Sequence, residues 1–138
     1  MIGIVVTGHG GFPNGILESV QLIAGKIEKI AVIPFNEDSE KLLADLESAI
    51  VEVDSGKGVV CFTDLAGGTP FNVSGKIAAT RDNVRVIGGT NSPMLLSALF
   101  KRNLSLDEFT STAIQDGKDS IKLFEMKKKE TEISEDGI

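Results

Sequence analysis

The amino-acid sequence predicts a doubly wound open α/β domain built on a mostly parallel sheet. Short apolar runs alternate with stretches whose apolar residues recur every three to four positions, and turn residues separate the two. The runs are apolar on both faces, as strands are in a parallel sheet that helices cover on both sides. At 138 residues, with 41% hydrophobic and 25% charged residues, the chain fits one globular domain.

Four strands are predicted, each followed by a helix. The expected strands are residues 1–8, 30–35, 58–65 and 84–89, and the expected helices are 14–25, 39–53, 70–80 and 92–101. Helical spacing gives one apolar face to Ile16, Val20 and Ile23, and another to Leu42, Leu43, Leu46, Ala49, Ile50 and Val53. Because crossovers between parallel strands are right-handed, few topologies remain, and we expect the common order 2-1-3-4.

The C-terminal region is less regular. Residues 105–121 fit a helix, and 121–126 (IKLFEM) alternate apolar and charged side chains as an edge strand does. We therefore expect the domain, residues 1–126, to end in an antiparallel edge strand. Residues 127–138 are charged and almost without apolar side chains, which predicts a solvated tail without fixed structure.

Composition argues against several classes of partner. The formal net charge is −6 at pH 7, whereas nucleic acid and anionic lipid select clustered lysine and arginine. A basic protein would instead be steered toward this surface. No segment has the pattern of a signal peptide or a membrane span, and the single cysteine, Cys61, lies inside an apolar run as a small buried side chain. We therefore expect a cytoplasmic protein.

The only histidine of the chain, His9, directly follows the first predicted strand, and Asp64 follows the third. These strands are neighbours in the order 2-1-3-4, so both side chains reach the same edge of the sheet. A carboxylate that accepts a hydrogen bond from one imidazole nitrogen leaves the other nitrogen free as a nucleophile. The simpler alternatives are that His9 is an exposed loop residue and that Asp64 only bonds nearby backbone amides.

A second candidate feature is an anion site after the third strand. Thr69, followed by a proline, predicts a helix start whose backbone N–H groups attract a phosphoryl group, and Gly67 and Gly68 permit close approach. Ser92 and Asn14 are expected to cap the helices after strands four and one in the same way. These residues are equally well explained as helix caps and turn glycines with no other role.

Standard cofactor motifs are not found in the sequence. No stretch fits the phosphate-binding P-loop, the dinucleotide-binding G-x-G-x-x-G motif after the first strand, or the G-x-S-x-G nucleophile elbow. One histidine and one cysteine do not by themselves supply a zinc site. The sequence therefore predicts neither a metal nor an organic cofactor.

Three motifs together resemble a known family. TGHGGF, TDLAGGTPFN and NSPMLL, in this order, are similar to the IIA component of the mannose-family (mannose, fructose and sorbose) phosphoenolpyruvate-dependent sugar phosphotransferase system, and the similarity extends to about Met126. The resemblance implies a phosphocarrier in which His9 accepts a phosphoryl group on Nε2 from the histidine-containing phosphocarrier protein and passes it to the IIB component. It also implies that Asp64 holds Nδ1 and that Thr69 lies near the phosphoryl group.

The resemblance further implies a doubly wound sheet whose final antiparallel strand, here 121–126, is exchanged in a homodimer. It implies a free-standing IIA subunit that reaches the membrane only indirectly, through the IIC/IID permease. Because His9 must meet two partners, we expect a shallow site with an apolar rim, for which Phe12, Pro13 and Met94 are the candidates.

Two positions depart from many members of the family: Gly8 stands where they carry serine or threonine, and Ala66 where they carry tryptophan. Gly8 puts in doubt a hydroxyl contact to the phosphate, and both departures are closer to the branch that serves N-acetylgalactosamine and related amino sugars. The transported sugar stays open. The alternative functions are a nucleotide- or phosphometabolite-binding module with no covalent step, and a regulatory interaction partner.

Overall fold

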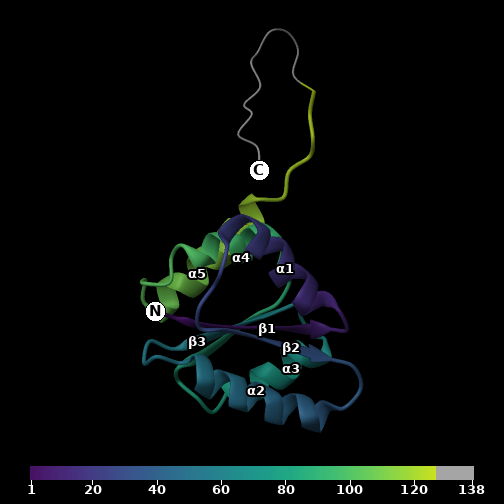
Figure 1. Ribbon diagram of the computed structural model, residues 1–138, viewed down its shortest axis with the longest axis vertical. Helices are drawn as coiled ribbons and strands as arrows, with labels where there is room; N and C mark the ends of the chain where they lie inside the picture. Colours follow the sequence, from purple (N-terminus) through teal and green to yellow (C-terminus); the bar gives the residue numbers. More distant parts are fainter. Residues whose placement is uncertain (127–138) are drawn as a thin grey trace.

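A four-stranded parallel sheet forms the middle of three layers in the computed structural model, which describes residues 1–126 (Figure 1). Its strands are β1 (Gly3–His9), β2 (Ile30–Phe35), β3 (Val59–Thr63) and β4 (Val84–Ile87). They lie in the order β2-β1-β3-β4, and every pair is parallel. The predicted α/β class and strand order are confirmed. The tail expected at 127–138 lies outside the described residues.

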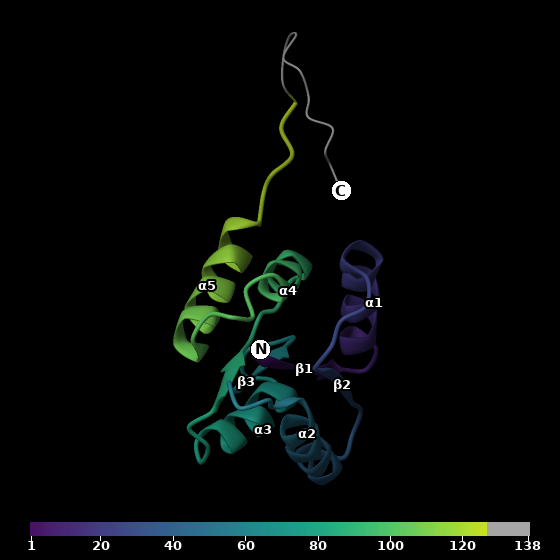
Figure 2. The same cartoon turned by 60° about the vertical axis from the view of Figure 1, so that its left-hand side comes forward.

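Helices cover both faces of the sheet (Figures 1 and 2). The helices α1 (Phe12–Ala24), α4 (Ser92–Leu99) and α5 (Leu106–Asp119) lie on one face, and α2 (Ser39–Val53) and α3 (Thr69–Ala78) on the other. Successive strand residues face opposite layers, so Val6 and Phe62 join the first core while Val5 and Cys61 join the second. Burial raises the pKa of the Cys61 thiol to about 12, as expected for a structural side chain.

The predicted caps of α3 and α4 are each wrong by one residue. Gly68 is the N-cap of α3 and Asn91 that of α4, and both have extended backbones. Thr69 and Ser92 are already the first helical residues, so their side chains are not at the cap position. Asn91 Oδ1 instead accepts the N–H of Met94 at 3.0 Å.

The first helix also starts earlier than predicted. Gly11 is the N-cap of α1, so Asn14 lies within the first turn and is not the cap. The buried face of α1 includes Ile16 and Val20, as expected, but Ile23 is 51% exposed. The buried face continues through Ala24, four positions beyond Val20, which leaves Ile23 on the outer side of the helix.

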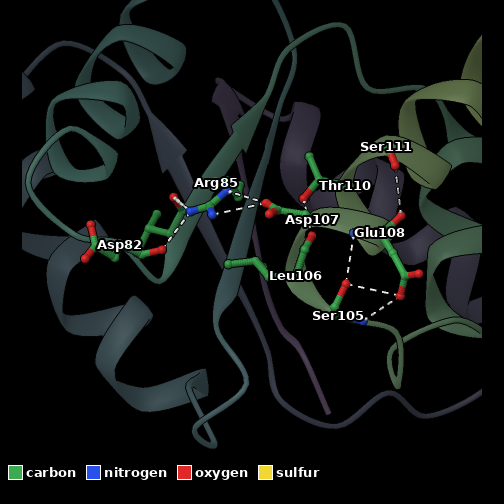
Figure 3. Close-up of polar contacts among 9 residues, drawn as sticks. Asp82, Arg85, Ser105, Leu106, Asp107, Glu108, Thr110 and Ser111 are labelled. Carbon is green, nitrogen blue, oxygen red and sulfur yellow. Dashed lines mark hydrogen bonds and ion pairs between the residues drawn. The ribbon is translucent and has the colours of Figure 1, made fainter.

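The helix predicted over 105–121 forms as α5 and begins with a reciprocal cap (Figure 3). Ser105 Oγ accepts the N–H of Glu108, and the Glu108 carboxylate accepts the N–H of Ser105. One turn of α5 is tied to the edge strand, because Arg85 donates twice to Asp107 Oδ1 at 3.1 and 3.2 Å. This ion pair is exposed and contributes little to stability.

Residues 121–126 form no strand within this chain. They run away from the body of the molecule beyond α5 (Figure 1). Their apolar side chains are between 76% and 84% exposed: Ile121, Leu123, Phe124 and Met126. Over the part of the chain that the structure describes, the sheet is therefore wholly parallel, and the expected antiparallel strand has no partner there. Within residues 1–126, no helix combines the length and hydropathy of a membrane span.

Arg102 fastens the end of the sheet at which β1 and β2 begin. Its side chain is 8% exposed, and its guanidinium donates to the carbonyls of Ile2, Glu28 and Lys29 at 2.7–2.8 Å. These carbonyls come from the two segments that lead into β1 and β2. Only a planar side chain with several fixed donors can serve all three.

We predict that Arg102→Met lowers the free energy of unfolding by about 1–3 kcal/mol, because the carbonyls of Ile2, Glu28 and Lys29 lose the guanidinium as donor, although that of Lys29 keeps the N–H of Ile4. Arg102→Lys should recover only part of this loss. The measurement is urea denaturation, with Arg85→Met as the control for losing an exposed arginine. Equal losses in Arg102→Met and Arg85→Met would contradict the assignment.

Candidate active site

His9 and Asp64 meet at the carboxyl ends of β1 and β3. His9 ends β1, and Asp64 directly follows β3, which pairs with β1. Asp64 Oδ2 lies 2.9 Å from His9 Nδ1 and accepts the backbone N–H of His9 at 2.8 Å. The His9 side chain is 45% exposed and that of Asp64 10%. The structure thus brings together the two residues that strand order predicted to be close.

The local environment keeps Asp64 ionised. Burial alone would raise the pKa of its carboxyl, but hydrogen bonds from the His9 backbone, the His9 ring and the Leu65 backbone outweigh burial and hold the pKa below its usual value. An ionised carboxylate only accepts hydrogen bonds, so His9 Nδ1 must carry the proton. In the neutral ring, Nε2 then holds a lone pair and can act as a nucleophile.

The first turns of α1 and α3 lie beside this pair and are uncapped. In residues 1–126, α2, α4 and α5 have a capping side chain, whereas α1 and α3 have glycine at the N-cap and no side-chain cap hydrogen bond. These two helices follow β1 and β3, whose ends carry His9 and Asp64. The unpaired N–H groups of both first turns therefore remain available to an anion.

Glycine is required in both loops of the site. Gly10 and Gly67 have φ of +52° and +88°, a region that side chains rarely adopt. Gly68 lies so close to the His9 ring that a Cβ built on it would be 3.0 Å from Cε1. The loop after β3 thus brings its backbone against the imidazole itself.

Gly8 has no room for a side chain. A Cβ at this position would lie 2.7 Å from Phe12 Cδ2 and 2.9 Å from Asp64 Cγ. Phe12 thus fills space that a hydroxyl side chain at position 8 would need. The glycine at position 8 thus has a packing cause in this chain.

Part of the expected apolar rim is wrong. Met94 is 5% exposed and packs against Gly117 of α5, so it lies in the core instead of on the surface. Pro13 is also buried, because it lies on the inner face of α1. Of the three proposed residues only Phe12, which is half-buried, reaches the surface.

Phe35 is a site residue that we did not predict from the sequence. It ends β2 opposite His9 in the parallel register, and its ring contacts the His9 ring in a T-shaped arrangement, with centroids 5.8 Å apart. The signal was available, because in the order 2-1-3-4 the end of strand two also borders the end of strand one. Among residues 1–126, no cluster of three histidine, cysteine, aspartate or glutamate residues could hold a metal ion.

Comparison with known proteins gives a consistent result. Residues 3–114 match the family model described as the fructose IIA component of the PTS, the phosphotransferase system. The chain is 31% identical over 130 residues to the mannose-specific EIIAB component of Escherichia coli (strain K12), covering 91% of this chain and 40% of that protein. It therefore spans about two fifths of the length of that relative. It is 30% identical to the fructose-specific EIIA component of Bacillus subtilis (strain 168), covering 74% of this chain and 71% of the relative.

Solved structures of IIA proteins have a similar fold. The phosphotransferase system component EIIA from Streptococcus agalactiae superposes with a TM-score of 0.80 at 33% identity, covering 88% of this chain and 95% of that one. The mannose/sorbose-specific IIA subunit from Enterococcus faecalis gives a TM-score of 0.84 at 23% identity, covering 92% and 97%. At that identity, the second likeness shows the fold alone.

The lowered pKa of Asp64 predicts how stability depends on pH. A carboxyl whose pKa is lower in the folded state stabilises the fold fully above its unfolded pKa of about 4, and loses this effect as the pH falls through the folded value. Asp64→Asn should therefore lower the free energy of unfolding by about 1–2 kcal/mol at pH 7. The difference in free energy of unfolding between Asp64→Asn and the wild type should become smaller below about pH 4.

Urea denaturation at pH 7, 5 and 3 measures this difference. Asp82→Asn, at an exposed aspartate outside the site, is the control and should stay near the wild type at each pH. An Asp64→Asn difference that is as large at pH 3 as at pH 7 would contradict the prediction.

Proposed function

The chain belongs to the mannose-type IIA family of the sugar phosphotransferase system, and from this we propose that it is a phosphocarrier that works through His9. It would accept a phosphoryl group from the histidine-containing phosphocarrier protein and pass it to the IIB component during sugar uptake. One observation carries the proposal: an imidazole held at Nδ1 by a carboxylate lies beside two uncapped helix N-termini.

The transfer step requires no proton movement at His9. Its Nε2 attacks the phosphorus, the N–P bond of the donor phosphohistidine breaks, and the electron pair returns to the donor imidazole. Nδ1–H stays hydrogen-bonded to Asp64, whose negative charge balances the positive charge that the ring gains. Catalysis then consists of positioning and charge stabilisation, as in other phosphoryl transfers.

We propose that Gly67, Gly68 and Thr69 form the phosphate cradle. Thr69 is the first residue of α3, so its backbone N–H has no intrahelical acceptor. A phosphoryl group on Nε2 would gain about 0.3–1 kcal/mol from the helix dipole, and more from direct hydrogen bonds. No metal or cofactor takes part in this proposal.

The partners follow from the same proposal. The net charge of −6 favours partners with a basic docking face, and half-buried Phe12 beside the site is our candidate docking contact. We propose a cytoplasmic location, with the membrane reached only through the IIB component and the IIC/IID permease.

We further propose a homodimer in which residues 121–126 pair antiparallel with β4 of the partner. Two features support the exchange. Within residues 1–126, β4 pairs only with β3, which leaves its outer edge open. A groove of about 250 Å³ beside this edge is lined by Val86, Ile87 and Ile114, and also by Ile121 at the start of the segment itself. The exposed apolar side chains that follow Ile121 would enter the partner's groove, at about 1.5–3 kcal/mol for each large one: Leu123, Phe124 and Met126.

Phosphoryl transfer tests the function. The protein is incubated with phosphoenolpyruvate, enzyme I and the phosphocarrier protein, beside a His9→Ala control, and phosphorus NMR is recorded at alkaline pH. We expect an Nε2-phosphohistidine signal that is absent from the control. Because His9 is the only histidine, such a signal on this chain has a single source. With active upstream proteins, an unlabelled wild type would favour the non-covalent binding module.

Solution mass tests the exchange. We expect a dimer by light scattering at micromolar concentration, and we expect Leu123→Asp to give monomers because a charge would enter the apolar groove. Lys122→Gln, next to it in the same segment, is the matched control and should remain dimeric. A monomeric wild type would contradict the exchanged strand.

A further inference from the structure

His9 ends β1, which lies between β2 and β3 in the sheet, and it is contacted from both of these sides. From the β3 side, Asp64 Oδ2 accepts hydrogen bonds from the backbone N–H and from the Nδ1–H of His9. Asp64 fixes the position of Nδ1, and the backbone of Gly68 lies beside Cε1. A second contact, on the opposite side of the ring, is needed to fix its tilt and with it the direction of Nε2.

That second contact comes from β2. The rings of His9 and Phe35 are inclined by 80°, the edge-to-face arrangement that aromatic pairs prefer. Phe35 is itself anchored, because its carbonyl accepts the N–H of Gly10 at 2.8 Å and its side chain packs against the core formed with α2 and α3. The more exposed His9 ring therefore rests against a fixed Phe35 ring.

We propose that Phe35 is a positioning residue that holds the His9 imidazole with Nδ1 on Asp64 and Nε2 directed outward for transfer. This inference deepens the proposed phosphocarrier function and rests on it. With Phe35 absent, the ring would leave Asp64 for part of the time, so that Nδ1 would compete with Nε2 for both the proton and the phosphoryl group.

The single histidine makes this measurable without any partner protein. In protein labelled with ¹⁵N-histidine, nitrogen NMR at alkaline pH reports which ring nitrogen carries the proton. We expect one tautomer, protonated at Nδ1, in the wild type and a mixture in Phe35→Leu. Phe35→Tyr, which keeps the ring, should restore the single tautomer. The control is Ile33→Ala, a half-buried residue of β2 that packs against the same core.

Phosphorylation gives a second readout. Phosphoramidate transfers its phosphoryl group to imidazole with release of ammonia and requires no protein docking. We expect only Nε2-phosphohistidine in the wild type and both isomers in Phe35→Leu, resolved by phosphorus NMR. Transfer from the phosphocarrier protein should slow about two- to tenfold in Phe35→Leu, the factor expected for one aromatic pair. It should stay near the wild-type rate in Ile33→Ala.

The proposal is overturned if Phe35→Leu keeps the wild-type tautomer and the single phosphohistidine isomer, even if transfer slows, because Phe35 then acts in packing or docking alone. It is also overturned if Ile33→Ala disturbs the ring as much as Phe35→Leu. Failure of the phosphocarrier function looks different. In that case the wild type is labelled by phosphoramidate but not by the phosphocarrier protein, and the nitrogen spectra still report on Phe35.

Discussion

The site depends on the parallel pairing of β1 with a neighbour on each side. Parallel strands end at the same edge of a sheet, so this pairing alone brings three side chains together. Asp64 reaches His9 from β3, and Phe35 reaches it from β2. The carboxylate supplies a charge and the phenyl ring a fixed surface.

The helices of residues 1–126 divide into two groups by their N-caps. Three of them have a capping side chain: Asp38 for α2, Asn91 for α4 and Ser105 for α5. The two that begin beside His9 have glycine, Gly11 and Gly68. Glycine at the N-cap costs only roughly a few tenths of a kcal/mol relative to a capping side chain. The fold thus gives up little stability at α1 and α3, and the unpaired N–H groups of their first turns stay available to an anion.

Much of this arrangement could be predicted from the sequence, because hydrophobic period and turn residues determine the strands, the helices and their order. The proximity of His9 and Asp64 follows from strand order alone. Met94 could not be placed in this way, because helical spacing does not tell which side of α4 another helix will cover, and α5 covers it. Phe35 was missed for a related reason: strand order brings it near His9, but only packing turns its ring toward the imidazole.

The crowding at Gly8 has an evolutionary consequence. Side chains at positions 8 and 12 would share one volume, which in this chain Phe12 occupies. A lineage that gained a hydroxyl at position 8 while keeping Phe12 would pass through an overpacked intermediate, at a cost of about 1–3 kcal/mol. A smaller residue at 12 would relieve only part of this crowding, because the same Cβ would lie 2.9 Å from Asp64 Cγ. Position 8 is therefore coupled by packing both to position 12 and to the carboxylate that holds His9.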